Sequence, residues 1–232
     1  MDGTDQSQYL VSYKTLRSII GAVGILLFLV PLIYGAVKGN LPESISRSYY
    51  TSLRDFFVGA LCVLGMFLVS YRGYDLLDTV ITDIAGVCVV VIAFCPTSSP
   101  NPKVAQTVSN HIHPIAASIA FVLLAVMALQ FTQVEQTDMG WRAVLKRLGK
   151  AAIYQFPKAR NAGRNYAYVT CAWIIVASII LAAISVIPLF WPEAFMLAAF
   201  GISWTIKGEP VARARAALKP PAPEARPEAA TV

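Results

Sequence analysis

Six apolar stretches, each of about 20 residues, recur along the chain, and each is long enough to cross the roughly 30 Å hydrocarbon core of a bilayer as a helix. A surface helix of a soluble protein would show a polar face, and these stretches show almost none. We therefore predict an all-α, polytopic membrane protein built as a bundle of six transmembrane helices. The predicted spans cover residues 18–37, 50–71, 79–96, 112–132, 166–187 and 190–206.

The charge pattern predicts how these spans are oriented. Only 14% of the residues are charged, whereas soluble domains carry about 25%. Of the 19 lysines and arginines, fifteen fall on the side of the two termini and three (Lys38, Arg47 and Lys103) on the other side, while Arg54 lies inside the second span. Because basic loops stay in the cytoplasm, both termini are predicted to be cytoplasmic, in a bacterial inner membrane. The net charge of +6 then reflects topology, and no nucleic-acid partner is expected.

The segments outside the spans divide the chain into three regions. Residues 1–17 form a cytoplasmic N-terminal segment, and residues 18–208 form the transmembrane domain. Within that domain, residues 138–156 have apolar residues at helical spacing and basic residues opposite them. This pattern predicts an amphipathic helix on the cytoplasmic leaflet, and a helix that binds a protein partner is the alternative. Residues 209–232 are rich in proline, alanine and charge, and we predict a disordered tail.

The four cysteines favour no metal or redox site. Cys62, Cys88, Cys95 and Cys171 lie in or at the edges of apolar stretches, and no C-x-x-C spacing occurs. Buried free thiols that act as small apolar side chains are the expectation. We predict no cofactor.

The orientation places several polar residues at one depth, on the outer side of the membrane. The second span begins there, the third ends there, the fourth begins there, and the fifth and sixth are joined there. Ionisable residues near a span usually face protein or water and often mark function. The candidate ligand-binding residues are Tyr49, Tyr50, Arg54, Asp55, His113 and Glu193.

Each of these residues also has a structural interpretation. The tyrosine pair is typical of an interfacial aromatic belt, and Arg54 and Asp55 can tether the helix or contact headgroups. Glu193 can complement the dipole at its helix start. His111 and His113 are two apart and so do not form the i, i+4 pair of a helical metal site; no metal is predicted. At the cytoplasmic end, Asp83 is expected to pair with a helix N-terminus or with a basic residue: Arg72, Lys207 or a residue of the 160–164 segment.

The motifs "SxxYYxxxRDxFVGxLCxxGxFLxxYRGYD", "DIAG", "AFxPT", "HxxxA" and "FGISWxxKG" cover most of residues 44–208. This pattern resembles that of a group of small uncharacterised bacterial integral membrane proteins. The resemblance implies a six-helix fold and no catalytic activity. A weaker similarity, to the alkaline ceramidase and progestin-receptor-like hydrolases, does not extend to their three-histidine zinc site, because this chain has 2 histidines.

Two non-catalytic functions fit these observations equally well. In the first, the outer polar cluster binds a lipid headgroup, a proton or a small polar ligand. Arg54 would hold an anionic group, Asp55 and Glu193 would balance charge, and His113 would titrate near neutral pH. In the second, the protein is an accessory subunit of a larger membrane complex, docked through residues 138–156 or the span surfaces. Membrane lipids are expected partners in both.

An intramembrane hydrolase or transferase is the remaining alternative. Asp55, Glu193 or His113 would then act as the acid or base, with Ser48 or Ser52 as the nucleophile. No nucleophile motif supports this chemistry, so the sequence favours a protein that is not an enzyme.

Overall fold

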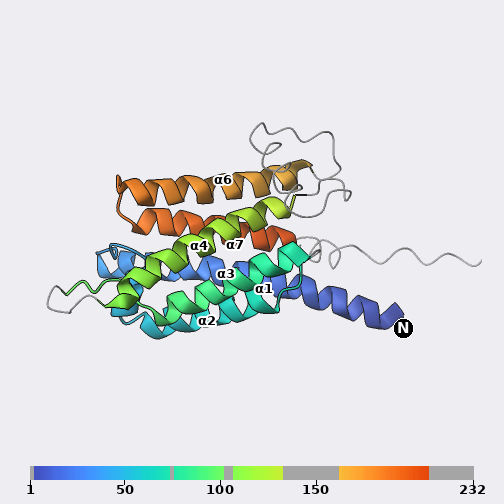
Figure 1. Ribbon diagram of the computed structural model, residues 1–232, viewed down its shortest axis with the longest axis horizontal. Coiled ribbons are helices and arrows are strands. Elements are labelled where there is room, and N and C mark those ends of the chain that lie inside the picture. Colours follow the sequence, from blue (N-terminus) through green and yellow to red (C-terminus); the bar gives the residue numbers. More distant parts are fainter. Residues whose placement is uncertain (1–2, 74–75, 102–106, 133–161, 209–232) are drawn as a thin grey trace, which may run out of the picture.

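The computed structural model describes residues 3–73, 76–101, 107–132 and 162–208. Within these ranges every regular element is helical (Figure 1). The elements are α1 (Gly3–Lys38), the 3-10 helix η1 (Ser46–Tyr50), α2 (Arg54–Ser70), α3 (Leu76–Phe94), α4 (Val108–Gln130), α6 (Ala162–Ile184) and α7 (Phe190–Gly208).

Four of these helices are long and apolar enough to cross a membrane. They are α3, α4, the Thr15–Lys38 part of α1 and the Gly163–Ile184 part of α6. The remaining two helices do not reach that length or apolar character. Helix α2 has 17 residues, and α7 carries the charged residues Glu193 in its first turn and Lys207 in its last. The all-α class is thus confirmed, with four helices of membrane-spanning character. That α2 and α7 also cross, and that both termini are cytoplasmic, remain predictions.

The helix bounds depart from the predicted spans at several ends. The helices α3, α4 and α6 begin three or four residues earlier than predicted, and the departures of α1 and α2 have identifiable causes. The first helix begins at Gly3, well before the predicted start at residue 18, because the segment between them contains no proline and no glycine after Gly3. The predicted second span starts at residue 50, but α2 begins at Arg54. Thr51 interrupts the helix there with extended backbone. Its hydroxyl donates to Ser48 O at 2.9 Å and accepts from Leu53 N at 3.1 Å.

The helices follow one another around the bundle in chain order (Figure 1). Each of α1, α2, α3, α4, α6 and α7 packs against the next, and α7 closes the ring by packing along α1. Further contacts join α4 and α7 across the middle. The most extensive contacts are those of α1 with α7 and of α2 with α3, whereas α1 and α2 touch less.

Pairs of glycines let two pairs of helices pack backbone against backbone. Between α2 and α3, a Cβ on Gly65 would lie 2.9 Å from Gly86 O, and a Cβ on Gly86 would lie 2.7 Å from Gly65 O. Between α1 and α7, a Cβ on Gly21 or on Gly201 would lie 2.7 Å from the carbonyl oxygen of the other glycine. Small residues let backbones approach closely where no hydrophobic effect drives helices together, as in lipid.

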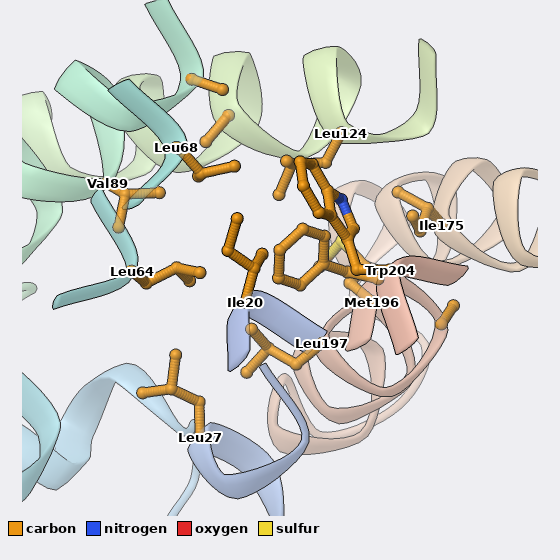
Figure 2. Close-up of a cluster of buried hydrophobic side chains, with 14 of the residues drawn as sticks. Ile20, Leu27, Leu64, Leu68, Val89, Leu124, Ile175, Met196, Leu197 and Trp204 are labelled. Carbon is orange, nitrogen blue, oxygen red and sulfur yellow. The ribbon is translucent and has the colours of Figure 1, made fainter. Parts of the chain in front are cut away.

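All six α-helices contribute side chains to one apolar core (Figure 2). The labelled members are Ile20 and Leu27 of α1, Leu64 and Leu68 of α2, Val89 of α3, Leu124 of α4, Ile175 of α6, and Met196, Leu197 and Trp204 of α7. A continuous core of this kind fixes the rotation of each helix about its own axis. It thereby decides which polar residues at the helix ends face inward.

The two ends of the bundle differ in character. The η1 end comprises residues 39–53, 95–101 and 185–189, which connect the helices on that side (Figure 1). The Trp204 end is aromatic: Tyr71 and Phe131 pack edge-on against Trp204, with ring centroids 5.0 and 5.1 Å away. The buried Lys207 ammonium donates to Phe131 O at 3.3 Å and lies 5.1 Å from the Phe131 ring centroid.

Two predictions concern the Trp204 end. Arg72 and Asp83 form an ion pair there at 3.2 Å, so one of the expected partners of Asp83 is confirmed. The amphipathic helix predicted for residues 138–156 and the tail predicted for 209–232 lie outside the described residues, and both stay predictions.

Candidate functional site

The η1 end is held in place by contacts with the start of α7. Ser46 N and Ser46 Oγ donate to the Glu193 carboxylate at 3.1 and 3.0 Å, one to each oxygen. Phe190 N donates to Glu43 O at 2.9 Å. Within the turn, Arg47 N donates to Ser44 Oγ at 3.2 Å. These bonds supply partners for backbone groups that a short 3-10 helix leaves open, and they fix the side chains that follow Ser46.

An open groove lies beside η1, between the start of α2 and the end of α3. We call it the Arg54 groove; its volume is about 410 Å³. Its polar lining residues are Tyr49, Arg54 and Asp55. The Arg54 guanidinium lies over the Tyr49 ring, 4.6 Å from the centroid, and donates to the Tyr49 hydroxyl at 3.0 Å. The apolar lining residues are Val58, Gly59, Ala93 and Phe94.

Arg54 and Asp55 do not pair with each other in the structure. The Arg54 side chain goes to Tyr49, and both Arg54 and Asp55 are exposed. Neighbouring residues on a helix point about 100° apart, which separates their head groups. The groove therefore presents one cationic and one anionic group that are not paired with each other, each open to a ligand.

Tyr50 joins η1 to the segment that follows α3. Its hydroxyl donates to Thr97 O at 2.6 Å. Its ring meets that of Tyr49 edge-on, with centroids 5.3 Å apart. Tyr50 thus supports Tyr49 and does not line the Arg54 groove itself.

Glu193 faces a different space, inside the bundle. It is half-buried and lines an internal cavity of about 60 Å³ together with Ser46 and apolar side chains. The Arg54 groove and this internal cavity have no lining residue in common. Sequence reasoning missed Ser46 as the partner of Glu193, since 147 residues separate them and no local pattern links them.

His113 is buried beside α3, with 4% of its surface exposed. Its Nδ1 lies 2.7 Å from Cys95 O, and its Nε2 is buried with no hydrogen-bond partner among the described residues. His113 lines neither the groove nor the cavity. His111 is exposed. Within the described part of the chain, no three histidine, cysteine or acidic side chains gather in a way that could hold a metal ion.

The serines named as alternative nucleophiles are also placed by the structure. Ser48 is buried, with 1% of its surface exposed, and its Oγ has no hydrogen-bond partner among the described residues. Ser52 is exposed, and its hydroxyl donates to Tyr34 at 3.2 Å. Neither hydroxyl is bonded to Asp55, Glu193 or His113, so no base activates them in this geometry.

No family model, curated protein or solved structure matches this chain.

Proposed function

We propose that this chain is a multi-pass integral membrane protein that binds a lipid headgroup in the Arg54 groove, at the outer surface of the membrane. The observation that carries the proposal is the composition of that groove: one exposed cation, one exposed anion and an apolar floor. The distribution of lysine and arginine, with fifteen on the opposite side, supports an outward-facing η1 end.

The two charges suit a zwitterionic headgroup. The Arg54 guanidinium has donors beyond the one that goes to Tyr49, and a planar guanidinium is the preferred partner of a phosphate group. The Asp55 carboxylate, one residue along, is placed for the ammonium group of the same lipid. A primary ammonium donates hydrogen bonds and a quaternary one does not, so phosphatidylethanolamine is the favoured class.

The apolar lining continues from the charges along α2 and α3. Val58 and Gly59 lie one turn further along α2, and Ala93 and Phe94 form the last turn of α3. A Cβ on Gly59 would meet nothing within 4 Å, which leaves open space along this face. The start of an acyl chain can lie there while the headgroup contacts Arg54 and Asp55, as an interfacial position requires.

The test is native mass spectrometry of the full chain, released from nanodiscs with equal parts of phosphatidylethanolamine, phosphatidylcholine and phosphatidylglycerol. We expect phosphatidylethanolamine to be retained preferentially. Arg54→Gln and Asp55→Asn should each lower retention about fivefold, equivalent to about 1 kcal/mol for an exposed charged contact. Gly59→Leu should abolish retention by filling the apolar part.

Arg72→Gln is the matched control, because Arg72 is an exposed arginine of the opposite end. Equal retention of the three lipids, unchanged in Arg54→Gln, would refute the proposal. A protein that co-purifies in stoichiometric amount and is kept in Arg54→Gln and Asp55→Asn would instead favour the accessory-subunit function.

A further inference from the structure

Three basic side chains gather at the Trp204 end of the bundle. They are Arg17 of α1, Arg164 of α6 and Lys207 of α7. Lys207 is buried, with 8% of its surface exposed, whereas Arg17 and Arg164 are half-buried. We call these three residues the basic cluster. Ionisable side chains that are held inside a membrane bundle commonly mark a site, because their burial is costly.

The contacts of α7 place the basic cluster at one level of the bundle. The Arg164 guanidinium donates to Ile206 O at 3.4 Å, which brings the start of α6 to the last turn of α7. On α1, a Cβ on Gly21 would lie 2.6 Å from Thr205 N. Arg17 comes one turn before Gly21. Because α1 begins and α7 ends at this end of the bundle, Arg17 lies beside the end of α7 (Figure 1).

Aromatic side chains hold the basic cluster in place. The Arg17 guanidinium lies over the Tyr71 ring, 5.4 Å from the centroid, and donates to the Tyr71 hydroxyl at 3.2 Å. The Arg164 guanidinium donates to the Tyr168 hydroxyl at 3.3 Å. The Lys207 ammonium lies 5.9 Å from the centroid of the same Tyr168 ring. Rings and hydroxyls attract cations without neutralising them, so these contacts orient the three charges and leave their sum unchanged.

Among the side chains that the structure describes at this end, positive charge exceeds negative charge. Asp78 is buried, with 6% of its surface exposed, and supplies one negative charge. It lies close to Tyr71, since the Thr82 hydroxyl is 3.0 Å from Asp78 O and 3.5 Å from Tyr71 O. Arg72 and Asp83 form an exposed ion pair and cancel each other. The basic cluster and Asp78 together therefore keep two positive charges.

We propose that the basic cluster binds a phosphate monoester, the form of phosphate that carries about two negative charges near neutral pH. Charges of one sign that are gathered away from water are costly unless an opposite charge accompanies them. The site is at the opposite end of the bundle from the Arg54 groove, and it does not depend on the lipid-binding function proposed above.

The donors of the basic cluster fit a phosphate monoester better than other anions. A planar guanidinium can bind two oxygens of one phosphate side by side, and an ammonium adds a point charge. The three free oxygens of a monoester point in different directions, so donors from three helices can bind one group together. A carboxylate has two oxygens in one plane and a single charge. A phosphodiester also carries a single charge.

The aromatic side chain at the centre of this end lacks a hydrogen-bond acceptor. Trp204 Nε1 is buried and has no hydrogen-bond partner among the described residues. A buried donor without an acceptor is costly. An anion with several oxygens would bring acceptors to this end of the bundle.

The experiment is native mass spectrometry of the full chain, released from phosphatidylcholine nanodiscs that contain equal small amounts of phosphatidic acid and phosphatidylglycerol. Phosphatidic acid is a monoester and phosphatidylglycerol a diester, so we expect about tenfold preferential retention of phosphatidic acid. A parallel sample contains an excess of glycerol 3-phosphate, a soluble monoester. Retention of phosphatidic acid in both samples would identify a lipid as the ligand. Its replacement by bound glycerol 3-phosphate would identify a soluble ligand, and both results support the proposal.

Arg17→Gln and Arg164→Gln should each lower retention of the monoester about tenfold, because each removes one charged donor. Arg17→Lys keeps the charge and loses the planar fork, so it should lower retention by a smaller factor than Arg17→Gln. Arg72→Gln is the matched control, since Arg72 is an exposed arginine of the same end, and it should change nothing. Arg54→Gln should leave retention of the monoester unchanged.

The proposal would be overturned if neither phosphatidic acid nor glycerol 3-phosphate were retained above phosphatidylglycerol. Unchanged retention in both Arg17→Gln and Arg164→Gln would overturn it as well. So would an equal loss in Arg72→Gln, because any arginine of this end would then serve.

Discussion

The closest approach of α2 and α3 gives a sharp test of the packing. Replacing Gly65 by alanine would place a Cβ 2.9 Å from Gly86 O and 2.6 Å from a methyl carbon of Val90. A backbone oxygen cannot rotate away, so the two helices must separate by several tenths of an ångström. Overpacking of this kind costs about 1–3 kcal/mol. A matched substitution, Gly59→Ala on the same helix, introduces a Cβ that meets nothing within 4 Å.

Both substitutions replace a helical glycine by alanine, so the gain in helix propensity of about 1 kcal/mol is common to both and cancels in the comparison. For a chain of this size, 1 kcal/mol shifts the melting temperature by about 2–4 °C. Gly65→Ala should therefore melt roughly 2–12 °C below Gly59→Ala when both are heated in the same detergent. Gly86→Ala should behave like Gly65→Ala. Equal melting temperatures for Gly65→Ala and Gly59→Ala would refute the close glycine contact.

Three further predictions address the helix ends. His113→Ala should lower the free energy of unfolding by about 1–3 kcal/mol, because it removes the hydrogen bond to the Cys95 carbonyl just after α3. The control His111→Ala, at an exposed position, should change the free energy of unfolding by less than about 0.5 kcal/mol. Equal effects of the two variants in denaturant titration would contradict the buried placement of His113. Asp83→Ala should lower the free energy of unfolding by less than about 1 kcal/mol, since the ion pair of Asp83 with Arg72 is exposed. A larger decrease would show that this ion pair is shielded from water. In intact cells, Asn101→Cys should react with an impermeant maleimide and Arg72→Cys should react only after permeabilisation; the reverse pattern would invert the proposed topology.

The sequence predicts which parts of this chain are helical much better than it predicts where the helices begin. Long apolar stretches identify the helices because nothing else in a bilayer satisfies their backbone groups. The apolar pattern carries no information about residues 3–17, where the first helix continues through polar sequence. It also cannot show the break at Thr51, which depends on one hydroxyl that bonds to two backbone groups.

The depth of the polar residues is equally predictable, and their grouping is not. Counting helix ends places Arg54, Asp55, His113 and Glu193 at one end of the bundle. The helices that carry them, α2, α4 and α7, all begin at that end (Figure 1). Whether two of them share a space depends on how each helix is rotated, and core packing sets that rotation. In the structure these four residues occupy different places. Arg54 and Asp55 line the Arg54 groove, and Glu193 lines the internal cavity. His113 is hydrogen-bonded to Cys95 O, just after α3.

One contact links the groove and the cavity without merging them. The interpretation of Glu193 as a complement to its own helix dipole concerns α7 alone, yet its two oxygens bind Ser46, 147 residues earlier in the chain. Ser46 and Tyr49 belong to the same 3-10 helix, one turn apart. The hydrogen bonds that fix Ser46 at the polar end of the cavity thereby also position the ring on which Arg54 stacks. A short polar segment with few apolar residues of its own becomes ordered because α7 supplies its anchor, and a sequence pattern confined to residues 44–55 contains no trace of that anchor.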